Sequence, residues 1–230
     1  MLRAFKTMIL DGLNIEVQRK GTLSNFIKSR SIDLVVDVGA NLGQFAKSIR
    51  SKGYKGRIHS FEPVEYVFNA LQKIASNDSR WNTFRTALGN RTGTAELHVY
   101  GNHTLSSFLK PTGLLSSYDN GAAMKTEKVP IQTLDGLLAD DPAKDIFLKI
   151  DVQGFEKQVL EGAKNSLHRV VALYVELPVK NLYEGSWSFR EAINFIDDLG
   201  FEPAQFRMVG PLPHDQASAV EFDALFRRKS

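Results

Sequence analysis

Short apolar runs alternate with segments of helical period along most of the chain. Strands are predicted at residues 34–38, 57–61, 83–88, 146–151 and 170–176. Helices are predicted over residues 44–51, from after the second strand through about residue 74, and over 155–167 and 188–199. Such alternation is typical of a parallel β-sheet covered by helices on both faces.

The middle of the chain departs from this alternation. Residues 94–100 alternate apolar and polar positions as a half-exposed strand does, and 129–134 form another predicted strand. Between them, residues 101–128 are rich in Gly, Ser, Asn and Thr. A loop of that length in a compact domain is usually functional. We therefore expect residues 94–134, here called the lid, to be an insertion that helps to cover a site.

Two further strands are predicted near residues 201–208 and 220–227, joined by GPLPHDQAS. Their short connection favours an antiparallel hairpin at the edge of the sheet. The predicted fold class is therefore α/β, a Rossmann-like three-layer sandwich. Its seven-stranded, mostly parallel sheet has one antiparallel strand and an inserted strand and loop region. We expect a helical N-terminal extension over residues 1–30 and a single domain over 31–230.

Composition narrows the class of protein. The 230 residues carry a net charge of only +3, too balanced to indicate a nucleic-acid partner. The absence of cysteine excludes disulfides, thiolate metal sites and cysteine nucleophiles. No apolar run is long enough to span a membrane, and the broken apolar patch at the N-terminus is unlike a signal peptide. A cytoplasmic protein is expected, and a homo-oligomer stays open.

A glycine loop follows the first predicted strand, where the chain reads Asp37-Val38-Gly39-Ala40-Asn41-Leu42-Gly43. Glycines there let a ligand approach the main chain, and the helix that follows offers unpaired N–H groups. The spacing does not fit the G-x-G-x-x-G fingerprint of dinucleotide-binding proteins. Asp37 would also sit poorly beside a pyrophosphate, but it suits a ligand that carries an amino group.

A second acid, Glu62, closes the second predicted strand about 20 residues after the loop. A carboxylate at that place can accept two hydrogen bonds from ribose hydroxyls. A ligand with a ribose, an amino-acid moiety and no phosphate is S-adenosylmethionine.

The chain resembles class I S-adenosylmethionine-dependent methyltransferases, and specifically the FkbM family, over roughly residues 30–228. KIDVQGFE at 149–156 is the most family-specific piece, whereas the glycine loop marks only the superfamily. The other matching pieces are VVDVGANLGQFA at 35–46, SFEP at 60–63, ALGNRTG at 87–93, LSSF at 105–108, TLD at 133–135 and EFDALFRRK at 221–229.

The resemblance implies a role for each position that matches the family. The methionine end of the cofactor would lie against Asp37, Gly39, Asn41 and Gly43. Glu62 would bind the ribose with Pro63 shaping the turn, and the adenine would lie beside Ala87 and Leu88. Many family members have glutamate where this chain has Gln153, which puts in doubt a need for charge there.

Chemistry is expected at the end of the strand at 146–151, because ligands of open α/β sheets bind beyond the carboxyl ends of the strands. Lys149 and Asp151 are two residues apart and share a face of that strand. Asp151 is the candidate base or acceptor-orienting group, and Lys149 is the candidate to hold its charge. The alternative is that the two residues merely satisfy one another.

Candidate acceptor contacts come from other segments near the same edge of the sheet. Glu176 ends the fifth predicted strand, and Tyr183 could offer a stacking surface for a sugar ring. The remaining candidates are His103 and Ser106 in the lid and His214 in the last turn. No metal site is predicted, because no two histidines have ligand spacing.

The favoured function is O-methylation of a hydroxyl group on a carbohydrate or another small-molecule or natural-product acceptor, and this acceptor class comes from the resemblance alone. An N-methyltransferase or an enzyme acting on a protein or peptide is the alternative. A nicotinamide-dependent oxidoreductase is disfavoured by the missing third glycine and by Asp37. A cofactor-binding module without catalysis has no support from a broken motif.

Overall fold

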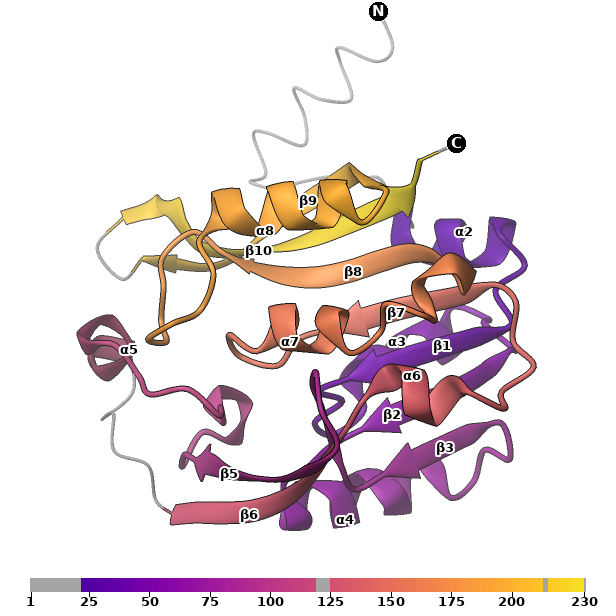
Figure 1. Ribbon diagram of the computed structural model, residues 1–230, viewed down its shortest axis with the longest axis horizontal. Coiled ribbons are helices and arrows are strands. Elements are labelled where there is room, and N and C mark those ends of the chain that lie inside the picture. The colour runs from indigo at the N-terminus through magenta and orange to yellow at the C-terminus, as the bar shows by residue number, and fades with distance from the viewer. Residues whose placement is uncertain (1–21, 119–124, 213–214, 230) are drawn as a thin grey trace, which may run out of the picture.

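The computed structural model describes residues 22–118, 125–212 and 215–229. A seven-stranded sheet forms its centre, in the order β3-β2-β1-β7-β8-β10-β9 (Figure 1). The bounds are β1 Leu34–Val38, β2 Arg57–Phe61, β3 Trp81–Phe84, β7 Ile146–Ile150, β8 Val170–Pro178, β9 Phe201–Leu212 and β10 Asp215–Arg228. Only β10 runs against its neighbours β8 and β9, so the predicted sheet with one reversed strand is confirmed.

Helices cover both faces of the sheet and make it a three-layer structure. One core contains buried side chains of α6 (Leu134–Leu138), α7 (Glu156–Glu161) and α8 (Phe189–Asp198). The opposite core contains those of α2 (Thr22–Ser29), α3 (Gln44–Ser51) and α4 (Glu65–Ala75). Strands β1 and β7 are buried at every position, as strands covered on both faces must be.

The lid contains most of a second, three-stranded sheet in the order β4-β6-β5. Its strands are β4 (Ala87–Leu88), β5 (Gly93–Val99) and β6 (Lys125–Gln132). The predicted loop at 101–128 also contains the short helix α5 (Gly113–Tyr118) and the 3₁₀ turn η1 (His103–Leu105). Figure 1 shows β5 and β6 below the central sheet, with α5 apart from it on the left.

Two predicted elements were wrong in their extent. The strand expected at 83–88 is two strands in two sheets, because Thr86 donates a hydrogen bond to the carbonyl of Pro130 and the chain there joins β6. The helix expected over 155–167 ends at Glu161, and the short turn η2 (Leu167–Arg169) follows it. Just after this helix the backbone of Gly162 lies in close contact with that of Gly89, since a Cβ on Gly162 would lie 1.9 Å from the Gly89 carbonyl oxygen.

The terminal hairpin is longer than predicted, since β9 reaches Leu212 and β10 begins at Asp215.

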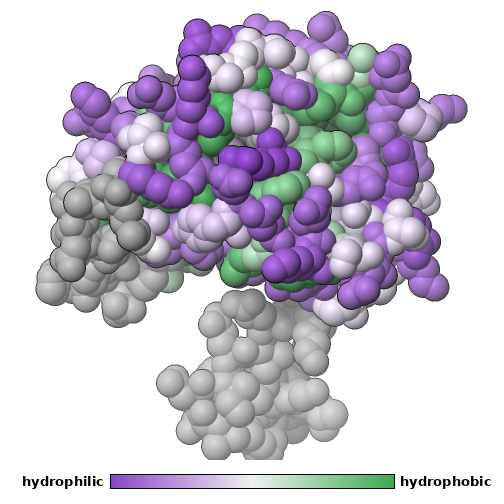
Figure 2. Space-filling model, turned by 90° about the horizontal axis from the view of Figure 1, so that it is seen from below, coloured by the Kyte–Doolittle hydropathy of each residue, from purple (hydrophilic) through white to green (hydrophobic). Residues whose placement is uncertain are grey.

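Polar side chains cover most of the face in Figure 2, with apolar patches between them. Among the described residues, no helix is both long enough and apolar enough to cross a membrane. Most of the predicted N-terminal extension lies outside the described residues.

Candidate active site

A cavity of about 1240 Å³ opens beyond the carboxyl ends of β1, β2 and β7. Its wall begins with the loop after β1, passes the end of β2 and continues across β8, β10 and β9. The lid contributes His103, Ser106 and Phe108 to the same wall. Ligand pockets typically measure about 300–1000 Å³, so this cavity is larger than most pockets that hold a single small molecule.

The loop after β1 needs glycine for steric reasons. Gly39 has a φ of 71°, and a Cβ there would lie 1.8 Å from the carbonyl oxygen of Asp151. Gly39 and Asn41 both contribute to the cavity wall, and their contact with a cofactor stays a prediction. Gly43 does not, because it packs under the ring of Trp81, where a Cβ would lie 2.7 Å from a ring carbon. Its glycine is thus explained by packing.

Glu62 is held rigidly at the cavity wall. One carboxylate oxygen accepts the backbone N–H of Asn41 and the other that of Val64, both at 2.9 Å. Burial raises the pKa of Glu62 to about 7, although the two hydrogen bonds act to lower it. Each oxygen keeps a second lone pair, so the carboxylate is fixed and can accept two more hydrogen bonds.

Apolar surface lies next to Glu62. Phe61, Pro63, Ala87 and Leu88 form part of the cavity wall there, and the contact of Ala87 and Leu88 with an adenine stays a prediction. Phe61 stacks on Phe84 at a centroid distance of 4.9 Å.

Asp37 is completely buried and does not reach the cavity wall. Its carboxylate instead lies 3.3 Å from Lys149 Nζ and accepts a hydrogen bond from Ser60 at 3.3 Å. Burial raises the pKa of Asp37, while the Lys149 ammonium opposes that rise. The place of Asp37 therefore indicates a partner for Lys149 and not a direct contact with a ligand's amino group.

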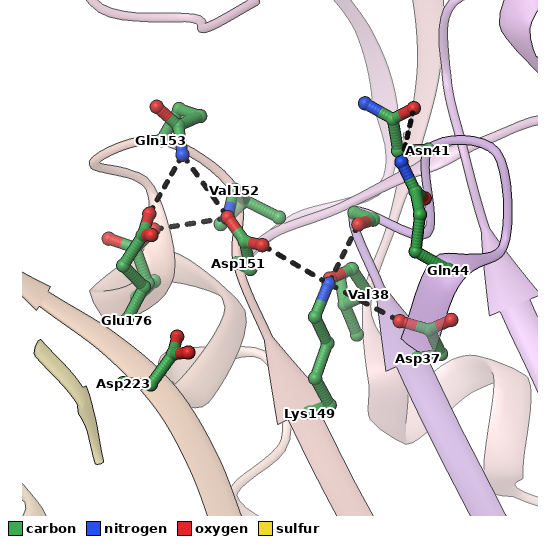
Figure 3. Close-up of polar contacts among 12 residues, drawn as sticks. Asp37, Val38, Asn41, Gln44, Lys149, Asp151, Val152, Gln153, Glu176 and Asp223 are labelled. Atoms are coloured by element: carbon green, nitrogen blue, oxygen red, sulfur yellow. Dashed lines mark hydrogen bonds and ion pairs between the residues drawn. The ribbon is translucent and has the colours of Figure 1, made fainter. Parts of the chain in front are cut away.

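Lys149 joins the two sides of the site (Figure 3). Its ammonium donates to the carbonyls of Val38 at 3.2 Å and Gly39 at 2.7 Å, and lies 3.5 Å from Asp151. Burial lowers the pKa of Lys149, but the carboxylates of Asp151 and Asp37 outweigh burial, so the pKa rises above its usual value. Lys149 therefore stays charged and fixes the loop to β7.

Asp151 follows β7 and has a half-exposed side chain at the cavity wall. One carboxylate oxygen faces Lys149, and the other accepts a hydrogen bond from Gln153 Nε2 at 3.1 Å. The same nitrogen of Gln153 donates to Glu176 at 2.8 Å. Figure 3 shows Gln153 above both carboxylates. The Asp151 carboxylate is thus held on both sides and open to the cavity.

The far wall of the cavity is rich in acids. Glu176 on β8 lies directly opposite Asp223 on β10, and Asp223 lies opposite Arg207 on β9, with which it forms an ion pair. Burial, followed by the charge of Asp151, raises the pKa of Glu176 well above its usual value. The same two causes raise the pKa of Glu221 to about 8. These side chains can donate or accept hydrogen bonds according to their protonation.

The lid contacts the site at two places. His103 Nδ1 lies 2.9 Å from Asn41 Nδ2 in the glycine loop. Ser107 donates to the main-chain carbonyl of Gln153 at 2.6 Å. The hydroxyl oxygen of Ser106 is buried and has no hydrogen-bond partner among the described residues. The lid thus connects the loop after β1 to the turn after β7.

One predicted acceptor contact, Tyr183, does not line the cavity. Tyr183 is buried behind the wall, and its hydroxyl faces the carbonyl of Leu105 at 2.8 Å and Gln153 Oε1 at 3.0 Å. His214 lies outside the described residues.

Sequence reasoning missed several residues of the wall, among them Gln153, Glu221, Asp223 and Arg207. It also missed Glu156, whose carboxylate accepts the backbone N–H groups of Val152 and Gly154 at 3.1 Å and so holds the turn after β7. The available signal was the alternation of acids at 221 and 223 within a strand, where an apolar pattern is expected. No group of acids and histidines in the described part of the chain could hold a metal ion.

Comparison with known proteins points to one family. The model of the methyltransferase FkbM domain matches residues 37–203. The chain is similar to the 2-O-methyltransferase NoeI of Sinorhizobium fredii, with 24% identity over 202 residues, 84% of this chain and 79% of that protein. It is also similar to methyltransferase sdnD of Sordaria araneosa, with 26% identity over 76% of this chain and 79% of that protein.

Solved structures support the fold. A methyltransferase FkbM from Methylobacillus flagellatus KT matches with a TM-score of 0.55 and 18% identity, over 85% of this chain and 43% of that one. Magnesium protoporphyrin IX methyltransferase from Synechocystis PCC 6803, solved with bound SAM, matches with a TM-score of 0.50 and 10% identity, over 90% of this chain and 77% of that one.

Proposed function

The chain belongs to the methyltransferase FkbM family, and on that premise we propose that it transfers a methyl group from S-adenosylmethionine to a hydroxyl group of a carbohydrate or similar small molecule. The observation that carries this proposal is that the fixed Glu62 carboxylate and Asp151 both line one cavity beyond the carboxyl ends of the strands. The 2-O-methyltransferase name of NoeI supports oxygen as the methylated atom.

The described residues fit the proposed cofactor. Glu62 keeps free lone pairs for two ribose hydroxyls, and Pro63, Ala87 and Leu88 offer an apolar surface for adenine. Gly39 and Asn41, in the loop after β1, line the part of the cavity proposed for the amino-acid end. When bound, S-adenosylmethionine supplies an electrophilic methyl group on a sulfonium sulfur.

Asp151 is proposed to accept the proton of the acceptor's hydroxyl group as the new C–O bond forms. The hydroxyl oxygen gains the methyl group, the C–S bond breaks with its electrons on sulfur, and the proton moves to the Asp151 carboxylate. Lys149 keeps that carboxylate in place from 3.5 Å and is a positioning residue in this account. General bases of this kind contribute about 10²–10⁴-fold to the rate, and alignment of the reactants contributes further.

The far wall is proposed to bind the acceptor. Carboxylates, a guanidinium and a phenol that alternate along adjacent strands suit a molecule with several hydroxyl groups. Glu176, Asp223, Arg207 and Tyr174 form this set, and His103 and Ser106 face the cavity from the lid.

The same wall also favours a second candidate, methylation of an amine. Five carboxylates line the cavity, those of Glu62, Asp151, Glu176, Glu221 and Asp223, against the four cations Lys28, Lys52, Lys149 and Arg207. Because the pKa values of Glu176 and Glu221 are raised, the excess of negative charge that would attract a cationic acceptor develops only as the pH rises above neutrality, where an amine also loses the proton that prevents it from attacking the methyl group. Amine acceptors therefore belong in the same test.

The proposal is tested by calorimetric titration of the purified chain with S-adenosylhomocysteine, with NAD in a parallel experiment. Binding of S-adenosylhomocysteine alone at micromolar affinity is expected. Transfer of tritium from labelled S-adenosylmethionine is then measured with methyl glycosides of common hexoses and deoxyhexoses, and with primary amines of similar size. Labelled glycosides support O-methylation, labelled amines favour the second candidate, and binding of NAD alone would contradict the cofactor assignment.

A further inference from the structure

Gln153 lies where the turn after β7, the acid-rich far wall of the cavity and the lid meet. Its φ of 55° lies in the left-handed region that non-glycine residues rarely adopt. Gly154 follows with a φ of 94°, and Glu156 ties the turn through the N–H groups on either side of Gln153. This unusual backbone turns the Gln153 side chain back over Asp151.

Every polar group of Gln153 apart from its N–H has a partner in the structure. The side-chain nitrogen gives hydrogen bonds to Asp151 Oδ1 at 3.1 Å and Glu176 Oε2 at 2.8 Å. The side-chain oxygen faces the Tyr183 hydroxyl at 3.0 Å, and the main-chain carbonyl accepts from Ser107 at 2.6 Å. The reverse orientation of the amide would set its oxygen against two carboxylates, so these contacts fix the orientation.

We propose that Gln153 is a positioning residue that holds the Asp151 carboxylate toward the acceptor and couples its position to the lid. The inference rests on the proposed function, because it assigns Asp151 to the transfer step. Lys149 holds one oxygen of Asp151 and Gln153 the other, so the carboxylate cannot rotate freely. Tyr183 joins Leu105 of the lid to the oxygen of the Gln153 amide.

The amide of Gln153 donates hydrogen bonds to two acids, which an ionised carboxylate at this position could not do. It carries two N–H donors, one for each acid, whereas an ionised glutamate has none. Such a glutamate would also stand about 3 Å from two other carboxylates, and like charges at that distance favour a shared proton. Further charges face this group from the neighbouring elements, those of Lys149, Glu156, Glu221, Asp223 and Arg207. A glutamate at 153 therefore needs a proton to donate to Asp151, and its single O–H group can replace only one of the two hydrogen bonds of the amide.

The test compares Gln153→Ala and Gln153→Glu with the wild-type chain, and with Gln72→Glu on the exposed face of α4 as a control for added charge. The acceptor is the methyl glycoside or amine that the wild-type chain labels fastest. Gln153→Ala should lower kcat about ten- to a hundredfold, as expected for a misplaced catalytic group, with KM for S-adenosylmethionine within about twofold. Gln153→Glu should regain activity as the pH is lowered, which the wild type and Gln72→Glu should not do.

A second readout needs no acceptor. In nitrogen-edited NMR spectra, the side-chain amide protons that disappear in Gln153→Ala should shift in the wild type as the neighbouring acids titrate. Amide protons that exchange freely and do not respond to pH would overturn the inference, as would a wild-type kcat and pH profile in both variants. If the wild-type chain neither binds S-adenosylhomocysteine nor transfers methyl groups, the proposed function fails, while the amide protons still report on the contacts of Gln153.

Discussion

The two halves of the cavity are built in different ways. The half that we propose for the cofactor, here called the cofactor half, contains Gly39, Asn41 and Glu62, which follow the ends of the consecutive strands β1 and β2. The half that we propose for the acceptor, here called the acceptor half, consists of side chains from β8, β9, β10 and the lid, segments that are far apart in the sequence. The first half is fixed by backbone hydrogen bonds, and the second by charges whose protonation varies.

Because of this difference, we expect the two halves to respond differently to substitution. A change of backbone geometry in the cofactor half should remove cofactor binding entirely, because the loop after β1 depends on the close contact of Gly39 with the Asp151 carbonyl. Changes in the acceptor half should alter turnover, specificity or pH dependence and leave cofactor binding intact.

Gly39→Ala should abolish binding of S-adenosylhomocysteine and lower the thermal midpoint. The new Cβ would lie 1.8 Å from the Asp151 carbonyl oxygen, and the φ of 71° adds a cost of about 1–2 kcal/mol for alanine. Calorimetry and thermal denaturation measure the two effects. Gly113→Ala is the matched control, because a Cβ there meets no atom within 4 Å. Normal affinity in Gly39→Ala would refute the close contact.

Asp151→Asn should reduce turnover by about 10²–10⁴-fold, because the amide cannot accept the acceptor's proton. Its affinity for S-adenosylhomocysteine should change little, since the side chain belongs to the acceptor half. Single-turnover transfer of labelled methyl groups and calorimetry provide the two numbers. Asp140→Asn, at an exposed position, should leave both unchanged. An equal loss of affinity and turnover in Asp151→Asn would argue against the division of the cavity.

Glu62→Gln should weaken S-adenosylhomocysteine binding about ten- to a hundredfold. Hydrogen bonds to a charged group contribute about 1.5–3 kcal/mol each, and the amide replaces one accepting oxygen by a donor that faces a backbone N–H. Calorimetric titration checks this value. Glu65→Gln, three residues later on the exposed side of α4, serves as the control. Unchanged affinity in Glu62→Gln would mean that the ribose lies elsewhere.

Glu221→Gln should make stability less dependent on pH. With its pKa raised to about 8, the folded chain keeps a proton that the unfolded chain releases near pH 4.5, so stability falls as pH rises between these values. Glu62 and Glu156, with pKa values of about 7, act in the same direction. The thermal midpoint of Glu221→Gln should therefore fall less between about pH 5 and pH 9 than that of the wild type.

The exposed Glu184→Gln variant is the control for that measurement and should follow the wild-type curve. A Glu221→Gln curve that also follows the wild type would show that Glu221 is ionised throughout this pH range.

The cofactor half could be predicted from the sequence because its information is local. Strand β1, the glycine loop and the end of β2 follow one another, so Gly39, Asn41 and Glu62 were found where the cavity has them. Asp37 shows the limit of this reasoning. Its place at the strand end was correct, but only the structure reveals that Lys149 lies between it and the cavity.

The acceptor half could not be predicted in the same way. The pairing of Glu176 with Asp223 depends on the register between β8 and β10, which a single sequence does not specify. The two-sheet arrangement of the strand predicted at 83–88 likewise depends on Thr86 and Pro130, which are distant in sequence. Tertiary contacts of this kind decide which polar residues meet in the cavity and which are used inside the protein, as Tyr183 is.

A crystal structure of the chain with S-adenosylhomocysteine bound would show which half of the cavity holds the cofactor. We expect the ribose hydroxyls to lie within hydrogen-bond distance of the Glu62 carboxylate, with the sulfur atom facing Asp151. A ligand whose adenosine instead lies over Glu176 and Asp223, with Glu62 free, would contradict the division into cofactor and acceptor halves.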